Sequence, residues 1–123
     1  MDGGGPVLIG VKGIVQGETF PLEYGKAVVI GRSRSCDISL RNCRRWLETE
    51  EAGQPPEESS KTVSRRHLKI NFLDADTVEL EDLSSNGTYL DGKRIDRAVI
   101  TDVKDTAHEV QLGAGETLRL EWR

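Results

Sequence analysis

Short segments with strand periodicity recur along the chain and restrict it to an all-β fold. In these segments apolar residues alternate with polar ones or form short runs, and glycine, proline and asparagine separate one segment from the next. Alternation puts every second side chain on the same face, so each segment can bury one face of a strand. The predicted strands are residues 7–11, 18–22, 27–30, 37–40, 67–72, 77–81, 109–112 and 117–122.

Many short strands separated by turns are typical of a β-sandwich or a barrel. The length of 123 residues allows one domain with one core. The last two predicted strands flank residues 113–116, which indicates a hairpin with a four-residue loop. The alternation predicts that a set of side chains points into the core: Ile38, Leu40, Leu68, Ile70, Phe72, Val78 and Leu80.

Charge limits the kinds of partner that we expect. The net charge is −4, which argues against a general attraction to nucleic acid or to an anionic membrane. Positive residues nevertheless gather in one part of the chain, so a local basic patch stays open as a prediction. They are Arg32, Arg34, Arg41, Arg44, Arg45, Lys61, Arg65 and Arg66, followed by Lys93 and Arg94.

The start of the chain has no signal-peptide pattern, and no apolar stretch is long enough to span a bilayer. We therefore expect a protein without membrane insertion in the cytoplasm, or in the nucleus if the organism is eukaryotic. Residues 1–6 are expected to form a flexible lead, and residues 7–123 the domain. Cys36 and Cys43 lack metal-ligand spacing, which argues against a metal and favours two reduced thiols over a disulfide. No cofactor is expected.

Residues 41–62 lack strand periodicity and are rich in glutamate, proline and serine. They predict a long insertion loop, mobile over residues 50–61, in which residues 44–51 have room for one short helix. Trp46 is unusual for a solvated loop. We expect it to pack over the edge of the sandwich, with contact to a partner as the alternative.

Three polar motifs stand at the ends of predicted strands: Gly31-Arg32, Ser64-Arg65-Arg66-His67, and the run from Asp82 to Thr88. This placement predicts one polar site built from loops. Arginine offers a planar fork of donors, serine a hydroxyl and asparagine an amide, and such groups suit a phosphate and the backbone that carries it.

These motifs resemble, in order and spacing, those of the forkhead-associated (FHA) domain family, over a region from about Val7 to the end of the chain. The resemblance implies a sandwich of two twisted antiparallel sheets whose loops bind phosphothreonine in a partner. It implies that Arg32 and Ser64 contact the phosphate, that Arg65 holds the site or the peptide backbone, and that Asn86 pairs with that backbone. Ser85 matches a position with a second hydroxyl near the phosphothreonine, and Gly31 and His67 match residues that shape the site from behind.

Two segments depart from the family pattern. Residues 41–62 are longer than the usual connection and border Ser64, and residues 98–108 add a second stretch before the last hairpin. The family usually continues into a final strand, so either residues 7–11 pair with a shortened terminus or that strand is incomplete.

The residues themselves predict supporting roles beside the site. Gly31 would let the chain turn sharply out of its strand, and Gly87 follows Asn86 in a tight turn that the Thr88 hydroxyl supports. His67 has no nucleophile spaced to use it as a base, so we expect its ring to bond loop backbone and hold Ser64. Asp82 is expected to tie down its loop, and His108 to lie on the surface.

The leading functional interpretation is a monomeric phosphopeptide-binding module that recognises a threonine-phosphorylated protein or peptide. The alternative is a phospho-independent interaction or assembly domain of the same fold, acting through Trp46 and the acidic loop. An enzyme is not expected, because the sequence has no catalytic nucleophile, metal cluster or glycine-rich nucleotide loop.

Overall fold

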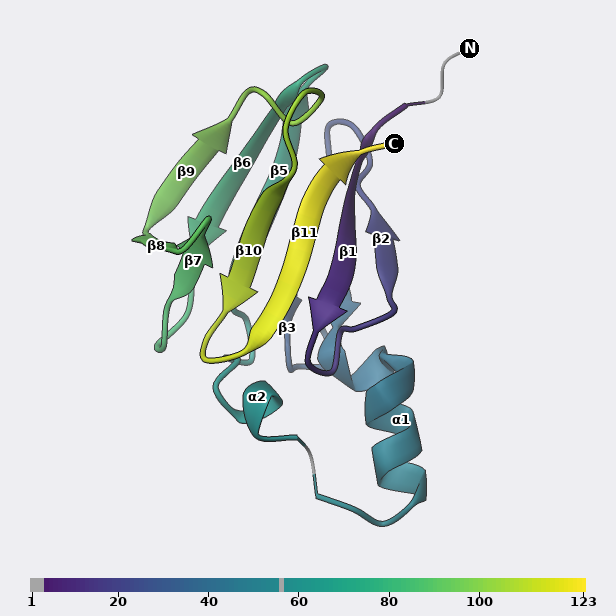
Figure 1. Ribbon diagram of the computed structural model, residues 1–123. Coiled ribbons are helices and arrows are strands. Elements are labelled where there is room, and N and C mark those ends of the chain that lie inside the picture. Colours follow the sequence, from purple (N-terminus) through teal and green to yellow (C-terminus); the bar gives the residue numbers. More distant parts are fainter. Residues whose placement is uncertain (1–3, 56) are drawn as a thin grey trace.

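Two β-sheets stacked face to face make up the body of the protein (Figure 1). The structure is a computed structural model that describes residues 4–55 and 57–123. Within these residues one sheet has the order β2-β1-β11-β10-β7-β8 and the other the order β4-β3-β5-β6-β9. The strands are β1 (Pro6–Lys12), β2 (Thr19–Pro21), β3 (Ala27–Gly31), β4 (Ile38–Ser39), β5 (Leu68–Asp74), β6 (Thr77–Asp82), β7 (Thr88–Leu90), β8 (Lys93–Ile95), β9 (Arg97–Ile100), β10 (His108–Leu112) and β11 (Glu116–Trp122). The expected all-β sandwich is confirmed.

The core lies between the sheets and consists of the side chains that alternation places inward. Leu8 pairs with Leu120 across β1 and β11, and Ile70 pairs with Leu80 across β5 and β6. All the side chains predicted to face inward are buried: Ile38, Leu40, Leu68, Ile70, Phe72, Val78 and Leu80. Burying one such side chain contributes about 1.5–3 kcal/mol relative to leaving it in water.

One strand pair departs from the expected antiparallel arrangement. Strand β4 runs parallel to β3, with Ile30 beside Ile38, whereas the other pairs in the described part of the chain are antiparallel. The connection after β3 loops out and returns the chain alongside β3 in the same direction. Strand β4 then ends early, because Leu40 begins the 3-10 helix η1 (Leu40–Asn42).

The last hairpin has a shorter loop than predicted. Leu112 and Glu116 are paired, so residues 113–115 form the loop. Glu116 is polar and suggested a loop residue, yet its side chain is fully buried. Its carboxylate accepts hydrogen bonds from the backbone N–H groups of Ile14 (2.9 Å) and Val15 (3.1 Å) and from Ser59 Oγ (2.6 Å). These bonds replace the water that the carboxylate loses on burial.

The insertion at residues 41–62 contains more regular structure than expected. Helix α1 (Arg44–Glu51) occupies the stretch predicted to allow a short helix, and α2 (Glu58–Lys61) lies in the part predicted to be mobile. The bond from Ser59 to Glu116 anchors α2 to the sandwich, and no local sequence pattern encodes such a long-range contact. Trp46 on α1 is 5% exposed, as expected of a residue that packs against the sandwich.

The amino-terminal end is paired earlier than predicted. Residues 1–3 of the expected flexible lead lie outside the described residues, but Gly5 exchanges backbone hydrogen bonds with Arg123 (2.7 and 2.9 Å), and Pro6 opens β1. Strand β1 pairs with β11 from Pro6 opposite Trp122 onward, which is the first of the two expected arrangements. No helix in the described residues has the length and apolar character needed to cross a membrane.

Helices α1 and α2 lie at one end of the sandwich, whereas β1 begins and β11 ends at the opposite end (Figure 1). Strand β3 ends and β5 begins near the helices. The loops with the polar motifs are therefore gathered at the helical end.

Candidate functional site

The two arginine-bearing loops are joined directly through their backbones. Arg32 N donates to Ser64 O (3.1 Å), and Ser33 N donates to Arg65 O (3.1 Å). A Cβ atom on Gly31 would lie 2.2 Å from Arg65 O and 2.9 Å from Ser64 O. The absence of a side chain at Gly31 thus allows the close approach of the two loops.

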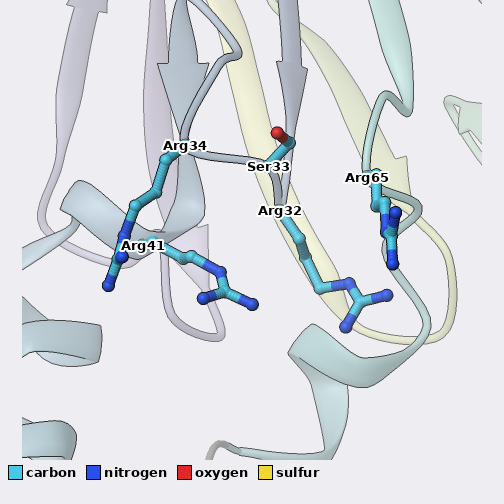
Figure 2. Close-up of a pocket in the computed structure, with 5 residues that line it drawn as sticks. All are labelled: Arg32, Ser33, Arg34, Arg41 and Arg65. Carbon is cyan, nitrogen blue, oxygen red and sulfur yellow. The ribbon is translucent and has the colours of Figure 1, made fainter.

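Arg32 and Arg65 line one pocket of about 380 Å³, together with Ser33, Arg34 and Arg41 (Figure 2). The Arg32 side chain is half-buried, and its Nε donates to Val63 O, which fixes its direction. Arg65 is exposed. The fold therefore brings two of the predicted site residues to one positively charged pocket.

Sequence reasoning missed three members of this pocket as site residues: Ser33, Arg34 and Arg41. Arg34 and Arg41 belong to the basic cluster seen in the sequence, but no motif marks them. Arg41 comes from η1, beyond β4, and only the folded chain places it beside Arg32.

Ser64 does not line this pocket, but its hydroxyl is held at the junction of the loops. Ser64 Oγ accepts a hydrogen bond from Ser85 N (3.1 Å), so its own O–H remains available to a ligand. His67 is fully buried, and its Nδ1 accepts from Ser64 N (3.0 Å). Its Nε2 therefore carries the proton and donates to Gly87 O (2.9 Å). Burial lowers the pKa of His67, which favours this neutral form.

The β6–β7 loop completes the predicted set. Asn86 is exposed, and its Nδ2 donates to Thr62 O (2.9 Å), which leaves a second N–H and the carbonyl oxygen for a ligand. Asn86 lines a separate pocket of about 290 Å³ with Tyr89 and Gln111, among others. Ser85 is exposed beside it, so both lie at the surface next to Ser64.

Asp82 ties this loop down, as its position predicted. Its Oδ1 accepts from Ser84 N (3.1 Å), Ser84 Oγ (2.6 Å) and Thr88 Oγ1 (2.8 Å). Burial alone would raise the pKa of Asp82, but these hydrogen bonds outweigh it and lower the pKa. Thr88 is fully buried, and Gly87 has φ 99°, which a glycine adopts without strain. The loop is therefore held by hydrogen bonds to the Asp82 carboxylate.

Two residues outside the motifs, His108 and Cys36, form side-chain hydrogen bonds. His108 is not the plain surface residue that was expected, since its side chain is 15% exposed and bonds Asp91 (2.6 Å) and Asp102 (2.7 Å). Burial acts to lower the pKa of His108, but the two carboxylates outweigh it and raise the pKa. Cys36 is buried, and its thiol donates to Arg65 O (3.0 Å). No group of three metal-ligating side chains occurs in residues 4–55 and 57–123.

Comparisons with known proteins identify the family to which this fold belongs. A model of the FHA domain family matches residues 28–119. The FHA domain of the CT664 protein from Chlamydia trachomatis is 24% identical, with a TM-score of 0.68 over 94% of this chain and 95% of that chain. The FHA domain of an Arabidopsis thaliana hypothetical protein is 22% identical, with a TM-score of 0.68 over 94% of this chain and 83% of that one.

EmbR of Mycobacterium tuberculosis, solved in complex with a low affinity phosphopeptide, is 22% identical, with a TM-score of 0.62 over 94% of this chain and 24% of that chain. A search of curated protein sequences found no match. Because the family model spans most of the chain, the protein belongs to the FHA domain family. FHA domains are interaction modules, known for phosphopeptide-dependent contacts between proteins.

Proposed function

We propose that this chain binds phosphothreonine in a partner protein, with the phosphate held by Arg32, Ser64 and Arg65. The observation that carries the proposal is the pocket that Arg32 and Arg65 share, next to the free hydroxyl proton of Ser64. Guanidinium groups bind phosphate through paired, charge-assisted hydrogen bonds. The hydrogen bonds of Val63 and His67 hold Arg32 and Ser64 before a ligand arrives, which lowers the entropy lost on binding.

Asn86 is proposed to pair with the backbone of the bound peptide through its remaining amide groups, with Ser85 as a second hydroxyl donor near the phosphate. In this proposal Gly31, His67, Gly87 and Thr88 support the site without touching the ligand. The proposal is supported by the bonds from Ser85 to Ser64 and from Asn86 to Thr62, which join this loop to the segment that precedes β5. A partner that acts independently of phosphate through Trp46 is disfavoured, because that side chain is buried.

Replacing Arg32 with alanine tests the phosphate contact. We expect Arg32→Ala to weaken binding of phosphothreonine peptides by about 1.5–3 kcal/mol, the usual loss for a hydrogen bond to a charged group. The measurement is fluorescence polarisation with a phosphothreonine peptide library. Arg66→Ala is the matched control, since Arg66 is exposed near the site but does not line the pocket. Urea unfolding of both variants separates lost binding from lost stability.

Phosphoserine versions of the bound peptides test the choice of threonine. Packing around the γ-methyl group should make phosphothreonine tighter by roughly 1 kcal/mol. Failure of every phosphothreonine peptide to bind, or equal binding by Arg32→Ala and wild type, would contradict the proposed function.

A further inference from the structure

The pocket holds more positive charge than one phosphate neutralises. Arg32, Arg34, Arg41 and Arg65 all line it. Among the described residues, one of these arginines has a carboxylate partner: a guanidinium nitrogen of Arg34 lies 4.0 Å from a carboxylate oxygen of Glu50. Both side chains are well exposed. Such a surface pair is weak. A phosphothreonine brings about −1.5 to −2 charges at neutral pH, so it compensates about two of the arginines. Of the other two, Arg34 has the weak surface pair with Glu50, and Arg41 has no carboxylate partner among the described residues.

The Arg41 side chain lies against the ring of Trp46. Its guanidinium lies 5.4 Å from the centre of the Trp46 ring, and Trp46 is itself buried in the core. Figure 2 shows the guanidinium of Arg41 turned toward that of Arg32. The Nε of Arg41 is buried and has no hydrogen-bond acceptor among the described residues. A buried donor without an acceptor is unfavourable, and an anion entering the pocket would supply the missing acceptor.

The two surplus arginines lie away from the loop that is proposed to hold the peptide backbone. Arg34 belongs to the β3–β4 connection and Arg41 to η1, whereas Asn86 lines a different pocket with Tyr89 and Gln111. A single phosphothreonine held by Arg32, Ser64 and Arg65 leaves Arg34 and Arg41 without a phosphate ligand. Their forked donors match phosphate oxygens in pairs.

We propose that Arg34 and Arg41 form a second anion subsite, which binds a second phosphate group on the same partner peptide. The ligand of this domain is then a doubly phosphorylated segment. The proposal rests on the proposed function, because the first phosphate must occupy the Arg32 and Ser64 position. The insertion takes part indirectly, since Trp46 on α1 supports the Arg41 side chain.

The experiment compares three peptides of one sequence by fluorescence polarisation. The first carries phosphothreonine alone, the second adds a phosphoserine, and the third has glutamate in place of that phosphoserine. The added group is scanned over about four residues on either side, which covers the extended chain length needed to cross the pocket. At the best position we expect the second phosphate to tighten wild-type binding by about tenfold or more.

Variants assign that gain to the subsite. Arg41→Gln and Arg34→Gln should each remove most of the gain, because they weaken binding of the doubly phosphorylated peptide more than binding of the singly phosphorylated one, to which they are close in the same pocket. Arg44→Gln is the matched control, because Arg44 is an exposed residue of the same insertion outside the pocket, and it should retain the gain. Arg34 is also exposed, so its variant keeps the test valid if Arg41→Gln disturbs Trp46.

Three results would overturn the proposal: no position gives a gain, the gain survives both pocket variants, or Arg44→Gln lowers it equally. A glutamate peptide that gains as much as the doubly phosphorylated one would overturn the assignment to phosphate. If the singly phosphorylated peptide fails to bind, the proposed function fails. If it binds and the second phosphate adds nothing, only the second subsite fails.

Discussion

Gly31 marks a close approach between the loops that carry Arg32 and Arg65. Its missing side chain leaves room for the Arg65 carbonyl, and a rigid backbone atom cannot move aside as a flexible side-chain end can. The position of the Arg32 guanidinium is therefore set by contact between two backbones. The hydrogen bond from Arg32 Nε to Val63 O then fixes the side chain itself.

Gly31→Ala should destabilise the protein. The added Cβ would meet Arg65 O at 2.2 Å, so the loops must separate. We expect a loss of about 1–3 kcal/mol in the free energy of unfolding, as is usual for overpacking, measured by urea denaturation. Gly5→Ala is the control, because a Cβ there meets nothing within 4 Å. Equal unfolding midpoints for the two variants would contradict the steric explanation.

At the level of elements, the short connection between β9 and β10 is joined to the β7–β8 turn through His108. Its two ring nitrogens bond Asp91 and Asp102, which come from these two connections. Because the carboxylates stabilise the charged imidazolium, the pKa of His108 is raised above its usual value near 6.5. The interaction thus stabilises the fold most at pH values at which the histidine is protonated in both the folded and the unfolded chain.

His108→Gln should therefore cost more stability in acid than in base. The contribution of a group whose folded pKa is raised is complete below the unfolded pKa and is lost as the pH rises through the folded pKa. We expect the difference in unfolding free energy between variant and wild type to shrink as the pH rises from about 6 through the raised pKa of His108 in the folded protein. Urea unfolding across this range measures it. Thr106→Ala, an exposed and non-titrating change in the same connection, should show no such trend, and a constant His108→Gln difference would exclude the mechanism.

Elements in which apolar and polar residues alternate clearly could be predicted from the sequence. Elements held in place by contacts with distant residues could not. Strands such as β5 and β6 bury one full face, so their alternation is visible in the sequence. Strands β8 and β9 are largely exposed and too short to show an alternation of apolar and polar residues. Helix α2 depends on Ser59 reaching the buried Glu116, and the polar character of Glu116 itself pointed to a loop.

The same distinction applies to the site. Arg32, Ser64 and Asn86 occur in short motifs, so the sequence marks them directly. Arg41 enters the pocket because the parallel strand β4 brings η1 next to the end of β3, whereas Arg34 follows Arg32 in the β3–β4 connection without a motif of its own. A pattern of neighbours along the chain does not encode that proximity.

For the molecule as a whole, the net charge and the charge of the pocket have opposite signs. The chain carries −4, yet four arginines line the pocket at the helical end. A phosphopeptide is repelled by the overall charge and attracted by the local one. At about 0.1 M salt the screening length is about 10 Å, so the nearby arginines dominate over the distant acidic residues.

Phosphopeptide affinity should therefore fall as salt is added. We expect a loss of several-fold between about 0.05 M and about 0.5 M sodium chloride, measured by fluorescence polarisation. Urea unfolding over the same salt range serves as the control for stability. Affinity that rises with salt would mean that the overall negative charge controls binding instead.

The pairing of β1 with β11 also determines how the protein responds to a pulling force. These strands are antiparallel neighbours, and Gly5 is bonded to Arg123 at the end of the sandwich opposite the helices. A force that separates these two residues acts across the ladder and breaks its hydrogen bonds one pair after another, beginning with the two bonds between Gly5 and Arg123. The loops that carry Arg32, Ser64 and Asn86 lie at the far end (Figure 1), so tension would reach them last.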